Sequence, residues 1–438
     1  MAHCRKRYYI YCQRQVLLEY REIKRRRHRL KIRGRRINYM ELTCMKRFRP
    51  KALNYLDERW RCDSAYSSSI VIPQNLSFKE NFDVSADVVK NLLYILLHKR
   101  GDITIDFSNC KNLSFSAIFL MNLLLRKYLK SLYLLRNVFG RVKRREIKMK
   151  PPKNKDDLRV YKYLHAMGWY TYDGFKDSDG EFMRLGIEEG KYRGITDNRK
   201  GVVGKKIVTF INNAYEPLEK KLTLESQNLI ESLTSEILNN AEDHSLQNNE
   251  WYVDGIALHE TIEGQEVVEL NLVIFNLGDS MYEAFEKTKE ANKAVYDILE
   301  SRYELHKGLF YERNQFEKES LFTLYMLNEG ISRLKYEDPS RGNGTMQFLK
   351  AFADLGSKSV LRDNRKSSLN VISGHTVLTC DDEVIPFHDG THLKISLNKE
   401  KDNKKLPDSQ YLKYYSRYIP GTFIDCKIYI TDKLVENV

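Results

Sequence analysis

Paired cysteines, clusters of metal ligands and long apolar runs are all scarce in this sequence. The 438 residues include seven cysteines, which form no C-x-x-C pair and no close group with histidine. Structural zinc sites are built from such groups, so the pattern argues against one and indicates free thiols in a reducing compartment. The longest apolar stretch, "FSAIFLMNLLL" (115–125), is shorter than a membrane span and is followed by Arg126 and Lys127. We therefore expect a cytoplasmic protein without a membrane span or a signal peptide.

Acidic residues are few at the start of the chain. Residues 1–60 hold 19 Lys and Arg against 5 Asp and Glu, a net charge of +14 that equals the net charge of the whole chain. The run "REIKRRRHRLKIRGRR" (21–36) could neutralise several phosphates of DNA or RNA. The alternative is a solvated extension with no dedicated ligand. We expect a basic N-terminal arm over residues 1–62, with nucleic acid as a candidate partner.

Short β-branched runs alternate with helical apolar spacing after this arm. Strands are expected at 67–73, 101–108 and 145–150, and helices at 85–100, 114–135 and 158–169. Ser85 is the expected N-cap of the first helix. Such alternation predicts a small α/β domain over residues 63–180. The glycine- and charge-rich stretch 181–206 predicts a connector, and residues 207–438 then read as a second, larger α/β domain.

The strand "ITIDFS" (103–108) runs through a serine-containing loop into a hydrophobic helix. This order resembles a STAS domain, the small α/β regulatory module of bacterial anti-sigma antagonists. The resemblance implies that Ser114 or Ser116 stands at the family's phosphorylatable position. The family's aspartate-serine-serine-glycine signature is not present here. The alternative, which we favour, is that both serines cap the helix.

The stretch "SEILNNAEDHS" (235–245) concentrates polar side chains within a helical pattern over 224–245. Glu236 and Asn240 are four residues apart, and Asp243 and His244 follow one turn later, so all four lie along one edge of the apolar face. A buried edge of this kind needs polar partners. A metal ion bound to phosphates would supply them, with the Asn240 amide oxygen as a hard ligand and Glu236 placed to activate a water.

Three further signals follow in the same order. A strand within 268–285 ends in N-x-G-x-S-M, and "SRGNGTMQFLKAFADLG" (340–356) brings two glycines to the start of an apolar helix. Glycines there allow backbone amides to approach a phosphate. Two Gly-Thr turns close the chain, one at Thr391 and one at Thr422.

This ordered set resembles the GHKL ATPases, the superfamily of DNA gyrase, the ninety-kilodalton heat-shock chaperone, histidine kinases and MutL. The resemblance covers roughly residues 207–432 and lies in the order of the signals. It implies a C-terminal two-layer α/β sandwich of Bergerat type, with a mixed sheet, beside the smaller N-terminal α/β domain. It also implies ATP and Mg²⁺ as cofactors.

Under this resemblance the polar helix carries the catalytic part of the site. Glu236 is similar to the catalytic base, and Asn240 is similar to the asparagine that binds Mg²⁺ between the phosphates. Asp243 and His244 match positions that flank the nucleotide.

The N-x-G-x-S-M turn would hold the base. Asn276 stands where the family has the aspartate that accepts from the adenine amino group, a departure that weakens adenine selectivity. Gly278 matches the next glycine. Ser280 stands in place of the second glycine, so the resemblance implies a less tight turn there. Met281 belongs to the same nucleotide-binding set.

The last part of the set would hold the phosphates and close the site. Gly342 and Gly344 resemble the phosphate-loop glycines, with Arg341 at the terminal phosphate and Thr345 beside them. Residues 282–340 would form a long helical lid. Thr422 is preferred to Thr391 as the late Gly-Thr of the site.

Three functions remain open from the sequence. The first is a slow ATPase that acts as an ATP-driven conformational switch in a bacterial regulatory or defence pathway, with an unidentified protein partner and an ATP-dependent homodimer. The second is a protein kinase of histidine-kinase or anti-sigma type that phosphorylates a separate partner. The third is a nucleic-acid-binding protein gated by ATP through residues 1–60. We favour the first.

Overall fold

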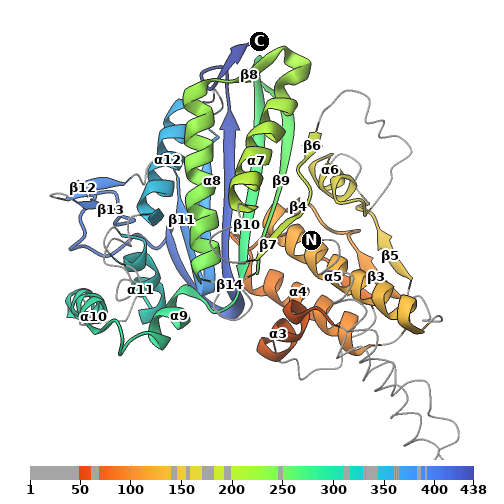
Figure 1. The fold of residues 1–438 in the computed structure, drawn as a ribbon, viewed down its shortest axis with the longest axis horizontal. Helices are drawn as coiled ribbons and strands as arrows, with labels where there is room; N and C mark the ends of the chain where they lie inside the picture. Colours follow the sequence, from red (N-terminus) through yellow and green to blue (C-terminus); the bar gives the residue numbers. More distant parts are fainter. Residues whose placement is uncertain are drawn as a thin grey trace, which may run out of the picture.

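The protein has a mixed α/β fold built around one large sheet (Figure 1). The computed structural model describes residues 49–60, 69–99, 101–139, 146–153, 158–169, 182–191, 199–244, 250–308, 316–328, 331, 344–359, 361, 363, 365–381, 386–389 and 392–438. Within these ranges no helix combines the length and the apolar character that crossing a membrane requires.

The large sheet has the strand order β11-β14-β10-β9-β6, and β7 also pairs with β9. Its strands are β6 (Phe182–Arg184), β7 (Glu188–Lys191), β9 (Glu250–Ile262), β10 (Gln265–Leu277), β11 (Ser368–Cys380) and β14 (Leu412–Ile430). Every pairing described in this sheet is antiparallel, so the mixed sheet expected from the sequence is not what these strands form. One physical reason is the two-residue turn at Glu263 and Gly264, both with positive φ, which joins β9 directly to β10 as a hairpin.

Three helices cover one face of this sheet (Figure 1). They are α7 (Arg199–Tyr215), α8 (Leu224–His244) and α12 (Gly344–Lys358). The start of α8 is set by Thr223, whose Oγ1 accepts the Ser226 N–H at 3.2 Å. Apolar residues of α8 such as Ile237 share one core with Leu272 and Ile274 of β10. The helix expected at 224–245 is therefore confirmed, apart from its last residue.

A second α/β unit is built from residues 51–166. Its elements are α3 (Lys51–Arg59), β1 (Ser69–Val71), β2 (Asn75–Leu76), α4 (Phe82–His98), β3 (Ile103–Asp106), β4 (Asn112–Leu113), α5 (Phe115–Phe139), β5 (Ile147–Lys150) and α6 (Leu158–Ala166). Strands β1, β3 and β5 form a parallel sheet, and β2 pairs with β4. The predicted alternation of strands and helices is confirmed here.

This unit packs on the second face of the large sheet. Side chains alternate between the two faces of a strand, so Phe275 and Phe423 point away from α8. The Phe423 ring lies 5.9 Å from the Phe78 ring and 6.4 Å from the Phe119 ring, both in the N-terminal unit. Since both faces of the sheet are apolar, the expected two-layer arrangement carries a third layer.

The stretch 181–206, predicted as a connector, contributes to the sheet where it is described. Strands β6 and β7 both pair with β9, and α7 begins at Arg199. The guanidinium of Arg184 in β6 forms an ion pair with the fully buried Asp254 of β9. The strand pairing and the ion pair together make this stretch part of the large sheet.

The serines expected as helix caps behave differently from one another. Helix α4 begins at Phe82, so Ser85 is not its N-cap; its buried Oγ instead donates to Ser77 O at 3.1 Å. Ser114 does cap α5, since its Oγ accepts the Ala117 N–H at 3.3 Å. Ser116 has no exposed surface and hydrogen-bonds to Asp425. Its burial leaves no access for a kinase.

The predicted lid, 282–340, is helical where it is described. It contains α9 (Met281–Lys287), α10 (Lys293–Gly308) and α11 (Lys318–Met326). Two small strand pairs complete the fold, β12 (Phe387–Asp389) with β13 (His392–Lys394) and β8 (Lys220–Leu222) with β15 (Val435–Asn437). Three cysteines fall in the described ranges, Cys110, Cys380 and Cys426, and all are buried and free, as expected.

Candidate functional site

A row of polar side chains crosses the three neighbouring strands β10, β14 and β11. Asn276 pairs with Thr422, and Thr422 pairs with Ser373, in the register of the sheet. All three residues lie on the face that α8 covers, because they continue the alternation that places Ile274 and Ile424 there. Thr422 Oγ1 lies 2.9 Å from Ser373 Oγ.

Strands β10 and β14 can approach each other this closely at the row only because residue 421 is glycine. Gly421 has φ +89°, and a Cβ at this position would lie 2.0 Å from the backbone oxygen of Asn276. The Gly-Thr pair at 421–422 therefore lies at this row, next to Asn276. Its competitor, Thr391, lies outside the described residues.

The turn after β10 enters α9 through Ser280. The Ser280 side chain accepts the Glu283 N–H at 3.2 Å, and the Glu283 carboxylate accepts the Ser280 N–H at 3.0 Å. This reciprocal pair is a capping box. With φ −64°, residue 280 does not need to be glycine, so the serine fits the turn. The S-x-x-E spacing was readable in the sequence and was missed there.

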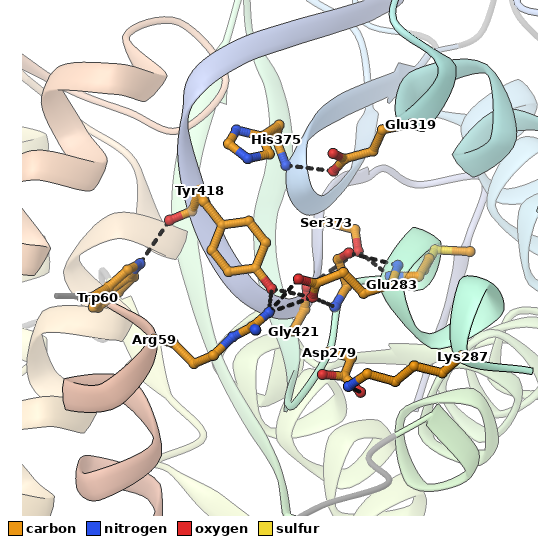
Figure 2. Close-up of polar contacts among 12 residues, drawn as sticks. Arg59, Trp60, Asp279, Glu283, Lys287, Glu319, Ser373, His375, Tyr418 and Gly421 are labelled. Atoms are coloured by element: carbon orange, nitrogen blue, oxygen red, sulfur yellow. Dashed lines mark hydrogen bonds and ion pairs between the residues drawn. The ribbon is translucent and has the colours of Figure 1, made fainter.

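Ser373 connects the start of α9 to this row through hydrogen bonds (Figure 2). Its Oγ accepts the Met281 N–H at 2.8 Å and lies 3.2 Å from Gly421 O. Sequence reasoning did not find Ser373. No local motif marks it, since its position depends on the pairing of β11 with β14.

A pocket opens between this row and α8. Its cavity volume is about 40 Å³. It is lined by Ile237, Asn240, Ala241, Ile274, Asn276, Met281, Leu327, Phe348, Val371, Thr422 and Ile424. Four of these were predicted as site residues: Asn240, Asn276, Met281 and Thr422. The other seven are all apolar, which suits the faces of a flat ring.

Asn276 is the pocket residue with an unsatisfied polar atom. Its side chain is only 3% exposed. Among the residues that the structure describes, its Nδ2 has no hydrogen-bond partner. A buried unpaired donor costs about 1–3 kcal/mol, so such groups in native proteins usually meet a ligand or an ordered water. Asn276 therefore holds a buried, unpaired hydrogen-bond donor in the wall of the pocket, at the end of β10.

Glu236 lies on α8 one turn before Asn240, about 6 Å along the helix axis. It is half-buried and does not line the pocket itself. Burial raises the pKa of the Glu236 carboxyl group above its ordinary value of 4.5. A carboxylate with a raised pKa is a stronger base at neutral pH.

For three other predicted residues the structure describes the backbone but not the side chain. Asp243 and His244 end α8, and their side chains are outside the described part of the chain. The same holds for the side chain of Thr345, which follows Gly344 in the first turn of α12. Phe348, one turn further, lines the pocket, so α12 begins near it.

Two other predicted residues, Arg341 and Gly342, lie outside the described residues. Gly278 lies within them. The backbone N of Gly278 would lie 3.1 Å from a Cβ at position 421, so Gly278 is part of the tight approach at Gly421.

The N-terminal unit reaches the site through the end of α3 (Figure 2). Arg59 donates to both oxygens of Glu283, at 2.5 and 2.6 Å, and Tyr418 OH donates to the same carboxylate at 2.5 Å. Trp60 Nε1 donates to Tyr418 O at 2.7 Å. Burial alone would raise the pKa of Glu283, but the bonds from Tyr418, Ser280 and Arg59 hold it below its ordinary value. We call Arg59, Trp60, Glu283 and Tyr418 the α3–α9 junction.

Metal binding at this pocket would depend on few protein groups. The described residues contain no group of three or more His, Cys, Asp or Glu side chains able to hold a metal ion. A hard cation could still be held by the Asn240 amide oxygen together with oxygens of a bound ligand.

Comparison of the chain with protein-family models, with curated proteins and with solved structures finds no match. The function is therefore indicated by the chemistry of the pocket alone.

Proposed function

We propose that this protein binds Mg-ATP in the pocket beside Asn240 and hydrolyses it slowly, as a GHKL-type ATPase that works as a conformational switch. The observation that carries the proposal is the composition of the pocket. Asn240, Asn276, Met281 and Thr422 are up to 182 positions apart in the sequence, yet all four line one hollow. The order of the sequence signals predicts the same four residues as parts of one nucleotide site.

The arrangement of the elements gives additional support. The GHKL resemblance implies a Bergerat-type sandwich, in which helices bearing the asparagine lie on one face of a sheet. Helix α8 carries Asn240 and packs with α12 on one face of the antiparallel sheet. Helices α9, α10 and α11 then occupy the position of the proposed lid, between the base-binding turn and α12 in the chain.

Each residue has a distinct chemical task in this proposal. The apolar walls hold the faces of the base, and Asn276 and Thr422 meet its polar edge. Asn240 contributes an amide oxygen to Mg²⁺, which when bound offsets the negative charge of the phosphates. Glu236 accepts a proton from the attacking water, a role that its raised pKa favours.

The switch part of the proposal depends on the α3–α9 junction. Glu283 caps the first turn of the lid helix α9 and also accepts hydrogen bonds from Arg59 and Tyr418. A movement of α9 on nucleotide binding would therefore change contacts with α3, which lies within the stretch 1–62 predicted as the basic arm. The arm and an unidentified protein partner are the proposed receivers of that change.

Two substitutions on α8 test the site. We expect Asn240→Ala to abolish Mg²⁺-dependent ATP binding, and Glu236→Ala to keep binding but to lose phosphate release. Asn239→Ala and Glu231→Ala are matched controls on α8, because Asn239 does not line the pocket and Glu231 is exposed where Glu236 is half-buried. ATP binding is measured by calorimetry and turnover by released phosphate.

The outcomes of this experiment separate the hypotheses. Unchanged turnover in Glu236→Ala would contradict its assignment as the base. Absence of ATP binding by the wild-type protein would refute the proposal as a whole. Transfer of labelled γ-phosphate to a protein instead of to water would favour the kinase alternative.

A further inference from the structure

The polar groups that face the pocket are few, and each of them can both donate and accept hydrogen bonds. Asn276 is 3% exposed, and its Nδ2 has no partner among the described residues. The polar groups of an apolar pocket fix the orientation and the identity of its ligand. The hydrogen-bonding character of Asn276 therefore decides which ring edge fits best.

An asparagine side chain forms different hydrogen bonds with the edge of a ring than an aspartate does. Its amide presents one acceptor oxygen and two N–H donors, whereas an ionised carboxylate only accepts. A half-turn about the Cβ–Cγ bond exchanges the donor and acceptor positions of the amide. Asn276 can therefore accept from a ring amino group in one orientation and donate to a ring carbonyl in the other.

Thr422 has the same freedom. Ser373 Oγ has one proton, which it can donate to Gly421 O at 3.2 Å or to Thr422 Oγ1 at 2.9 Å. In the first case Thr422 donates to Ser373 and offers only lone pairs to the pocket. In the second case Thr422 accepts from Ser373, and its own proton is available to the ligand.

We propose that the pocket accepts purine nucleoside triphosphates with either a 6-amino or a 6-oxo group, and that Asn276 is the residue that sets this breadth. The inference rests on the proposed function, because it assumes that the ligand is a nucleotide. The apolar walls, among them Ile274 and Ile424, contact ring faces and do not distinguish the two kinds of purine. The discrimination must therefore come from the polar edge.

The test compares nucleotides on the full chain. Binding of ATP, ITP, GTP and UTP is measured with Mg²⁺ present, for the wild type and for Asn276→Asp. ITP differs from ATP mainly at the 6-position, GTP adds a 2-amino group, and UTP reports the contribution of the triphosphate without a purine.

For the wild type we expect Kd values for ATP and ITP within about tenfold of each other, with UTP weaker than both. In Asn276→Asp a carboxylate would face the 6-oxo group, acceptor against acceptor. The ratio of the ITP to the ATP Kd should then rise by about tenfold or more, because a buried polar group without a partner is strongly selected against.

Each outcome bears on the inference in a definite way. Wild-type protein that binds ATP but not ITP contradicts the inference and leaves the proposed ATP site standing. UTP binding as tight as ATP binding shows that the base is not read and also contradicts it. If no nucleotide binds, both the site and the inference are wrong. The wild-type comparison alone decides the matter should Asn276→Asp fail to fold.

Discussion

Replacement of Gly421 by alanine tests how closely β10 and β14 approach each other at the row formed by Asn276, Thr422 and Ser373. A Cβ at this position would lie 2.0 Å from Asn276 O, whereas ordinary contacts begin at 3.4 Å. Strands β10 and β14 would have to separate by more than one ångström at the end of the pocket. The backbone φ of +89° is itself unfavourable for any residue with a Cβ.

The expected loss of stability follows from two contributions. Holding alanine in a left-handed backbone conformation costs about 1–2 kcal/mol. The strand separation weakens one or two backbone hydrogen bonds, each with a net value of about 1 kcal/mol. We therefore expect Gly421→Ala to lower the free energy of unfolding by about 3 kcal/mol. At roughly 2–4 °C per kcal/mol for a large domain, the unfolding temperature should fall by at least about 5 °C.

The assay is thermal unfolding of the full chain, followed by ATP titration at a temperature where both proteins are folded. Gly356→Ala is the matched control. Gly356 lies in α12, and a Cβ there would meet nothing closer than Ser367 Cβ at 4.0 Å, so alanine should stabilise by about 0.5–1 kcal/mol. An unchanged unfolding temperature and unchanged ATP affinity in Gly421→Ala would refute the reasoning.

Two further predictions concern the contacts between the N-terminal unit and the sheet. Arg59→Ala should lower stability by less than about 1 kcal/mol, because the ion pair with Glu283 is partly exposed, yet it should abolish any ATP-induced change in Trp60 fluorescence. The control Arg417→Ala removes an ion pair with Asp87 that joins the same units without a residue of α9, and it should preserve that change; equal loss in both variants would contradict the assigned role. Burial alone would raise the pKa of Glu269, but Lys427 and Arg159 hold it below its ordinary value of 4.5. A carboxylate with a depressed pKa stabilises the fold above its unfolded-state pKa, and this stabilisation is lost as the pH falls through the folded-state value. Glu269→Gln should therefore be less stable at neutral pH but lose less stability than the wild type on acidification from about pH 5 to about pH 3. Parallel acid-unfolding curves for the two proteins would speak against the pairing.

Local sequence patterns were sufficient for helix α8 and for four of the residues that line the pocket. The spacing of Ile230, Leu233 and Ile237 predicts α8, because a helix brings these positions to one face and the sheet buries them. The same periodicity places Asn240 at the edge of that face. The order of signals around Asn276 and Thr422 predicted two residues that meet in the pocket. Such information is local, or lies in the order of motifs, and both can be read along a chain.

Other features were decided only when the strands paired. Ser373 joins the site because β11 and β14 align it with Thr422, and no neighbouring residue in the sequence signals that register. The need for glycine at 421 comes from the backbone of Asn276, which is 145 positions away. The third layer arises because both faces of β10 and β14 are apolar, so Phe275 and Phe423 had to be covered by the N-terminal unit. Sequence periodicity determined which residues are buried, whereas strand register and packing determined what they meet.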